Sequence, residues 1–96
     1  MIAEYYIHLK EYLSFKSIST DGNFNNEIQT CSNRLKELFE QNNFQVEVVS
    51  NYWNPIIIAS YFVDNNLENG LIYGHYDVQN ANQIDWRKEN PFNLYI

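Results

Sequence analysis

Apolar residues recur at helical spacing in two stretches of the N-terminal half of the chain. Over residues 2–15 the recurring positions are Ile2, Tyr5, Tyr6, Leu9 and Leu13. Over residues 26–41 they are Ile28, Cys31, Leu35, Leu38 and Phe39. A spacing of three or four residues places side chains on one face of a helix, so the pattern predicts two amphipathic helices. Residues 17–23, rich in Ser, Asp, Gly and Asn, predict a loop between them.

Asparagines mark the expected ends of the second helix. Asn25 or Asn26 is predicted to cap its N-terminus, and Glu27 places a favourable negative charge in the first turn. Asn43 is predicted to end the helix in the left-handed conformation, because Asn is the usual substitute for Gly at that position.

After Asn43 the pattern changes to one that is typical of strands. Residues 45–49 alternate polar and apolar side chains, which predicts a half-buried strand. Residues 55–63 are apolar on both faces and predict an interior strand. Because the connection between them is short, these two strands are expected to form a hairpin.

A third strand is predicted over residues 71–75, after a turn-rich connector at residues 64–70, and the chain is irregular from Gln79 onward. The element order, two helices and then three strands, indicates the α/β class. The third strand is apolar on both sides and therefore needs cover on both faces. Two helices are too few for this purpose, so we expect these 96 residues to be an incomplete part of a larger fold.

The residues at the end of the predicted third strand are the candidates for a chemical role. His75 and Asp77 are two residues apart, so on an extended strand they share one face while Tyr76 takes the other. Imidazole is the commonest metal ligand, and a nearby carboxylate often fixes its tautomer. The pair is therefore a candidate half-site for a metal. The alternative is a surface pair or a structural hydrogen bond, because so short a motif also occurs by chance.

Composition narrows the classes of partner. The net charge is −6, and the six basic residues are scattered, which disfavours nucleic acid as a partner. No stretch approaches the roughly 20 apolar residues of a membrane span, and the N-terminus lacks the features of a signal peptide. A single cysteine fits a reducing compartment. We expect a soluble, cytoplasmic protein without a membrane partner.

Two further residues have candidate roles that compete with simple packing. Cys31 lies on the apolar face of the second predicted helix, so we interpret it as a small buried hydrophobe rather than a nucleophile. His8 has no second ligand candidate at i+4, so we interpret it as an ordinary helix residue.

The segment Leu71–Gln79, with the core Tyr73-Gly74-His75-Tyr76-Asp77-Val78-Gln79, resembles the M20 family of metallopeptidases, which contains aminoacylases, deacetylating amidohydrolases and dipeptidases. The resemblance also covers the opening helix, Ser17-Ile18-Ser19, the second helix, the strand at residues 46–49, residues 55–61, Trp86 and Pro91-Phe92. Tyr76 and Gln79 are closer to the dipeptidase branch. Asn80 and Asn90 depart from the prolines that are common in that branch.

The resemblance implies the N-terminal part of a zinc-aminopeptidase-like catalytic domain with a centre of two zinc ions. His75 would be a zinc ligand, and Asp77 would be a catalytic-site carboxylate that holds the His75 imidazole. A bridging aspartate, a glutamate base, further ligands and a lid or dimerisation domain, through which the enzyme could form a homodimer, would follow Ile96. Trp86 and Pro91-Phe92 are expected to serve loop packing.

Other acidic and histidine residues do not complete the metal site by spacing. His8, Asp21, Asp64 and Asp85 form no compact ligand motif such as H-x-x-x-H. The resemblance thus implies a fragment of a dipeptidase that hydrolyses peptide bonds of small peptide substrates with zinc-activated water and is inactive alone. The alternative is a non-catalytic scaffold module, or half of a split enzyme that assembles with a partner chain.

Overall fold

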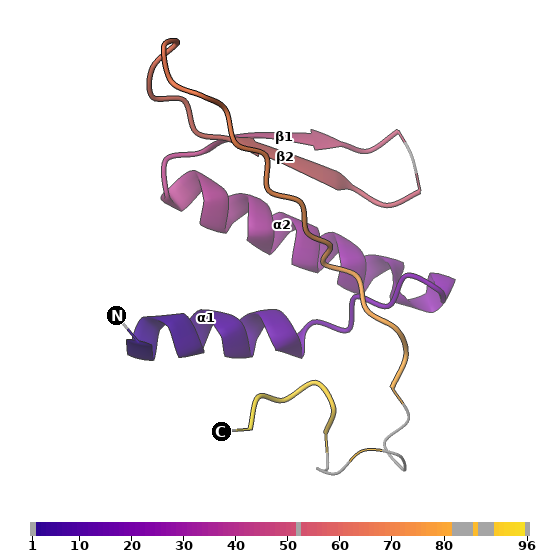
Figure 1. Ribbon diagram of the computed structural model, residues 1–96. Coiled ribbons are helices and arrows are strands. Elements are labelled where there is room, and N and C mark those ends of the chain that lie inside the picture. The colour runs from indigo at the N-terminus through magenta and orange to yellow at the C-terminus, as the bar shows by residue number, and fades with distance from the viewer. Residues whose placement is uncertain (1, 52, 82–85, 87–89, 96) are drawn as a thin grey trace. The chain divides into compact units, whose positions relative to one another are not determined.

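The computed structural model describes residues 2–51, 53–81, 86 and 90–95. These residues form a small mixed α/β structure, with helices α1 (Ile2–Ser14) and α2 (Asn25–Gln41), a 3-10 turn at Gly22–Phe24, and strands β1 (Gln45–Val49) and β2 (Ile56–Ser60) (Figure 1). The chain divides into two compact units. The first unit comprises Met1–Cys31 and Asp77–Ile96, and the second comprises Ser32–Tyr76.

Helix α1 confirms the predicted element, but its apolar stripe is not buried. The helix contains no fully buried residue, and Ile2, Tyr5 and Tyr6 of the predicted stripe are exposed. Hydrophobic spacing therefore identified the helix correctly, whereas burial depends on tertiary packing that a local pattern does not contain.

The predicted cap of α2 is wrong. The Asp21 side chain accepts a hydrogen bond from the backbone nitrogen of Asn23, and so caps the 3-10 turn that comes before α2. This turn continues directly into the helix, and Asn25 already has helical backbone angles. An N-cap residue normally has extended backbone angles, as Asp21 does, whereas Asn25 and Asn26 are already part of the helix.

The core of the first unit includes residues of the predicted loop. Ser17 and Ile18 are buried, together with Ile28 and Cys31 from the first turns of α2. Ile18 forms a parallel bridge with Val78, and the Val78 amide donates a hydrogen bond of 2.9 Å to the Ser17 carbonyl. The polar composition of residues 17–23 concealed this role, because one apolar residue, Ile18, makes the central contact.

Strands β1 and β2 form the predicted antiparallel hairpin, with five residue pairs from Gln45–Ser60 to Val49–Ile56. Strand β2 is shorter than predicted, because the pairing of Ser60 with the first residue of β1 leaves residues 61–63 without a partner on β1. Ile56 and Ile58 are exposed. The prediction of an interior strand is therefore wrong in this structure, because no third strand covers or pairs with β2 among the described residues.

Aromatic contacts join the end of α2 to the hairpin within the second unit. The rings of Phe39 and Phe44 have centroids 5.3 Å apart, and Phe44 lies 5.4 Å from Tyr61. Between helix and strand, Asn43 adopts a positive φ of 68°, which confirms the left-handed helix end predicted for it.

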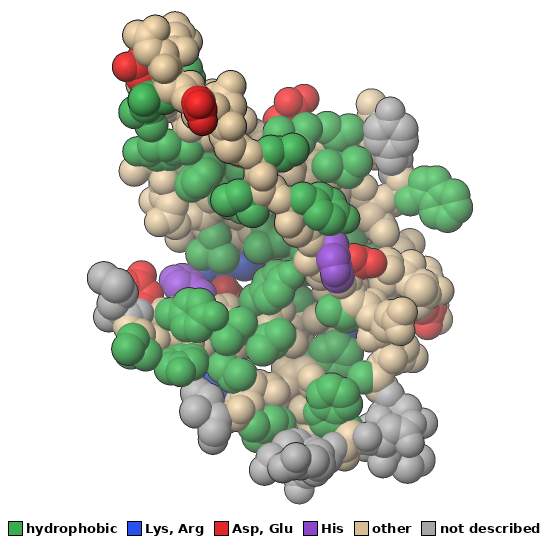
Figure 2. All heavy atoms as spheres, viewed as in Figure 1, with side chains coloured by type: hydrophobic (Ala, Val, Ile, Leu, Met, Phe, Trp, Pro, Cys, Tyr) green, Lys and Arg blue, Asp and Glu red, His purple; other side chains and the backbone are tan. Residues whose placement is uncertain are grey.

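The predicted third strand at residues 71–75 does not form. This segment is drawn as coil in Figure 1, and Leu71, Ile72 and Tyr73 are 96%, 97% and 86% exposed. A strand needs a neighbour for its backbone hydrogen bonds, and the sheet of the described residues contains only β1 and β2. Figure 2 shows many hydrophobic side chains on the face in view.

Candidate functional site

Asp77 is held by a serine that lies far away in the sequence. The Ser19 hydroxyl donates a hydrogen bond of 2.7 Å to Asp77 Oδ2, across 58 residues of chain and in a partly buried setting. Asp77 itself is partly buried, whereas His75 is exposed. The two candidate residues therefore differ in environment, and Asp77 has a defined partner in the first unit.

The backbone next to Asp77 is fixed at the same place. The Val78 amide bonds to the Ser17 carbonyl, and Ile18 bridges to Val78. Ser17 and Ser19 thus flank the buried Ile18, and one of them meets the motif through its backbone while the other meets it through its hydroxyl. Residues 17–19 and 77–78 form one connected group, which we call the serine–aspartate contact.

Titratable groups around this contact are biased toward their neutral forms. Burial raises the pKa of Tyr12, and the nearby Cys31 and Asp77 raise it further. Burial also raises the pKa of the Cys31 thiol to about 11, against an opposing hydrogen bond with Ser17. Cys31 is therefore protonated at neutral pH and fully buried, which confirms its interpretation as a small core residue and disfavours a nucleophilic role.

The described residues do not form a complete zinc site. They contain no group of three or more His, Cys, Asp or Glu side chains placed to hold a metal ion. A zinc site takes at least three protein ligands, and the motif offers one imidazole and one carboxylate. The described residues alone therefore do not supply the ligands that a zinc ion would need.

The other sequence candidates are engaged in local contacts. His8 Nε2 lies 3.7 Å from a carboxylate oxygen of Glu4 on α1. Asp64 accepts a hydrogen bond from the Asn66 amide in the connector, much as Asp21 does before α2. Asp85 and residues 82–83 of the predicted irregular segment lie outside the described residues.

Tyr76, Phe92 and Trp86, the other aromatic residues that the resemblance includes, do not belong to a group of metal-ligand side chains among the described residues. The Tyr76 hydroxyl donates a hydrogen bond of 2.7 Å to the Pro55 carbonyl in the second unit. In the first unit the Lys16 ammonium lies 5.8 Å from the centroid of the Phe92 ring, a packing contact. Trp86 is exposed.

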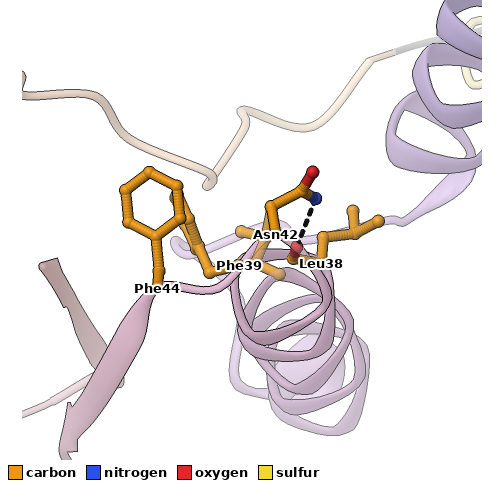
Figure 3. Close-up of a pocket in the computed structure, with 5 residues that line it drawn as sticks. Leu38, Phe39, Asn42 and Phe44 are labelled. Carbon is orange, nitrogen blue, oxygen red and sulfur yellow. Dashed lines mark hydrogen bonds between the residues drawn. The ribbon is translucent and has the colours of Figure 1, made fainter. Parts of the chain in front are cut away.

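A hollow of about 360 Å³ lies in the second unit. Its lining is mainly apolar and consists of Leu35, Leu38, Phe39, Asn42 and Phe44 (Figure 3). The Asn42 side chain donates a hydrogen bond of 2.8 Å to the Leu38 carbonyl, so its amide is committed to the helix end. None of the predicted site residues lines this hollow.

Ser19 is the residue of the site that the sequence did not identify. Its only signal was membership of Ser17-Ile18-Ser19, which the resemblance included without assigning a role. In comparisons with family models, curated proteins and solved structures, nothing matches this chain. None of the helices in the described ranges combines the length and the apolar character needed to cross a bilayer.

Proposed function

We propose that the chain is the N-terminal portion of the catalytic domain of an M20-type dipeptidase. The complete enzyme would hydrolyse peptide bonds of small peptides in the cytoplasm with water activated by two zinc ions, and would form a homodimer through its further domain. His75 would supply one zinc ligand, with Asp77 as its orienting carboxylate. The described residues offer too few ligands for a zinc site, so the chain alone is expected to be inactive.

One observation carries this proposal. Two stretches that share the resemblance, residues 17–19 and the motif, are 58 residues apart at Ser19 and Asp77, yet they meet through a side-chain hydrogen bond. A backbone hydrogen bond and a bridge join them at the adjoining residues. A chance surface pair would not require a second, distant segment to hold its carboxylate.

The exposure of the segment before the motif agrees with membership of a larger domain. Leu71 and Ile72 are almost completely exposed, although large apolar side chains gain about 1.5–3 kcal/mol each when they are buried. Leu71, Ile72 and Tyr73 are three large exposed side chains in succession, a pattern that is typical of a surface that another part of a domain covers.

The test compares the two histidines of the chain in the protein that contains it. Hydrolysis of dipeptides is measured with added zinc for the wild type, His75→Ala and His8→Ala. We expect His75→Ala to abolish activity and His8→Ala to retain it, because His8 lies on α1 beside Glu4. Full activity of His75→Ala would contradict the proposal. So would the absence of an Asp, Glu and His ligand set in any reading frame downstream of the Ile96 codon.

A second candidate function is a non-catalytic scaffold module, or one half of a split enzyme. The observation that favours it is the complete pairing of the hairpin, in which all five residues of β1 have a partner. The purified chain distinguishes the two functions. A monomer that unfolds cooperatively supports the module, whereas an aggregating chain without cooperative unfolding supports the incomplete enzyme.

A further inference from the structure

Asn69-Gly70 is the one place in the chain where an asparagine is followed by a glycine. Asparagine is a thermolabile residue. Its side-chain amide can be lost without an enzyme, because the backbone nitrogen of the next residue lies close to the side-chain carbonyl carbon. A side chain on that next residue crowds the nitrogen and narrows the freedom of the backbone, whereas glycine does neither. An asparagine before a glycine is therefore the most reactive kind.

The structure leaves the Asn69-Gly70 pair open. Both residues are exposed and lie in coil at the end of the connector of residues 64–70 (Figure 1). Among the residues that the structure describes, no hydrogen bond holds the Asn69 side chain or the Gly70 amide. A Cβ atom added at Gly70 would meet no atom within 4 Å, so no neighbouring group restricts the backbone at this point.

The other two asparagines of this connector are held. The nitrogen that would attack Asn65 is the Asn66 amide, which donates a hydrogen bond of 3.0 Å to Asp64 Oδ1. The nitrogen that would attack Asn66 is the Leu67 amide, which donates a hydrogen bond of 3.2 Å to the Asp64 carbonyl. Each hydrogen bond must break before its nitrogen can turn toward the asparagine side chain. The connector therefore contains two restrained asparagines and one open one.

We propose that Asn69 is a site of spontaneous deamidation, and that the open backbone at Gly70 makes it the first asparagine of the chain to react. The Gly70 nitrogen forms a bond to Asn69 Cγ and gives up its proton. The bond from Cγ to Nδ2 breaks, and Nδ2 leaves with that proton as ammonia. Water then opens the resulting succinimide ring. Opening at Cγ gives aspartate, whereas opening at the backbone carbonyl gives isoaspartate, in which the chain continues through the former side chain.

The reaction changes the chain directly before the exposed apolar residues that begin at Leu71. Either product adds one negative charge to a protein whose net charge is already −6. Isoaspartate also lengthens the backbone by one methylene group. This inference does not depend on the proposed function, because it uses only the connector of the second unit.

The test follows the purified chain during incubation near neutral pH by mass spectrometry of its peptides. Cleavage after Glu68 separates Asn69 from the other two asparagines of the connector, and fragmentation distinguishes aspartate from isoaspartate. The first variant is Gly70→Ala, which the backbone accepts because the φ of Gly70 is not positive and the added Cβ has open space. We expect it to slow the reaction at Asn69 at least about tenfold, since its methyl group crowds the attacking nitrogen.

Asn66→Gly provides a matched comparison within one molecule. It creates a second asparagine–glycine pair, at Asn65, in which the attacking nitrogen is the one that donates to Asp64 Oδ1. In the folded chain Asn65 should react about fivefold more slowly than Asn69, the factor that corresponds to one hydrogen bond. In denaturant, which removes this hydrogen bond, the two rates should become equal.

Three results would overturn the proposal. An unchanged rate at Asn69 in Gly70→Ala would exclude attack by the Gly70 nitrogen. Earlier deamidation of another asparagine in the wild type would contradict the place given to Asn69. Equal rates at Asn65 and Asn69 in folded Asn66→Gly, or a difference that persists in denaturant, would show that the open backbone at Gly70 does not set the rate.

Discussion

The hydroxyl of Tyr76 donates a hydrogen bond of 2.7 Å to the backbone carbonyl of Pro55, the residue just before β2. The two residues are 21 positions apart, and the contact is partly buried. Tyr76 is the central residue of the His75-Tyr76-Asp77 motif. The contact therefore ties the middle of the motif to the start of a strand in the second unit.

Tyr76→Phe removes this hydroxyl and keeps the ring. We expect the free energy of unfolding to fall by about 1 kcal/mol, because the Pro55 carbonyl loses a hydrogen bond in a partly buried place. Denaturant unfolding measures the change. Tyr73→Phe is the matched control, since Tyr73 is 86% exposed in the same segment and should be neutral. Equal effects of the two variants would contradict the role given to the Tyr76 hydroxyl.

Two isoleucines provide a matched test of where the core lies. Ile18 is 1% exposed and Ile72 is 97% exposed. Ile18→Ala should lower the free energy of unfolding by about 2–5 kcal/mol, the usual cost of emptying a buried site. Ile72→Ala should change it by less than about 0.5 kcal/mol. A large loss for Ile72→Ala in denaturant unfolding would show that its segment packs in solution.

Ser32 on α2 is buried, and its hydroxyl has no hydrogen-bond partner among the residues that the structure describes. A buried hydroxyl without a partner costs about 1–3 kcal/mol. Ser32→Ala removes this cost, and alanine is a better helix former than serine. We therefore expect the midpoint of thermal unfolding to rise or stay unchanged. Thr30→Ala is a suitable comparison, because the exposed Thr30 hydroxyl donates to the Asn26 carbonyl and its removal gains no such relief. A clear loss of stability for Ser32→Ala would indicate an undetected partner.

The buried thiol of Cys31 makes the stability of the fold depend on pH in the alkaline range. Burial raises the pKa of its thiol from 9.0 to about 11, so between these values the unfolded chain loses a proton that the folded chain keeps. Stability is therefore fully present below pH 9 and falls as the pH rises toward 11. Unfolding followed over this range should show the decline. Cys31→Ala should flatten it, leaving the part due to Tyr12, whose pKa burial also raises.

Under the proposed function, Asp77→Asn and His75→Ala should differ in kind. Asp77→Asn keeps the shape of the side chain and should reduce kcat/KM by about 10- to 100-fold with most zinc retained, as for other residues that orient a ligand. His75→Ala should reduce bound zinc directly. Activity and zinc content, measured together on the protein that contains this chain, distinguish the two effects. Unchanged activity of Asp77→Asn would show that its role is wrong.

Local sequence patterns predicted the helices and the hairpin, because their information lies within a few residues. The spacing of apolar residues gave α2 to within one residue, and Asn43 gave its end. The prediction failed where an element depends on distant partners. Residues 71–75 have the composition of a buried strand, but a strand also needs a neighbour to pair with, and composition does not supply one.

The candidate site likewise has one part that the local sequence predicted and one part that depends on a distant contact. The motif drew attention to Asp77, because a carboxylate next to a histidine is chemically suggestive. Nothing in the local sequence linked it to Ser19, since that contact spans 58 residues and depends on the bridge between Ile18 and Val78. A serine in a polar loop cannot be recognised as part of a site from the sequence alone. The role of Ser19 follows only from its contact with Asp77 in the structure.

The first unit consists of two chain segments, Met1–Cys31 and Asp77–Ile96, with the whole second unit inserted between them. During synthesis, residues 2–31 leave the ribosome well before their partner Val78 exists. In the released chain the hairpin, whose contacts are local, is expected to form before the two segments of the first unit meet, since short loops close faster than long ones. The serine–aspartate contact is consequently among the last to form, and residues 17–19 must wait exposed until the motif is made.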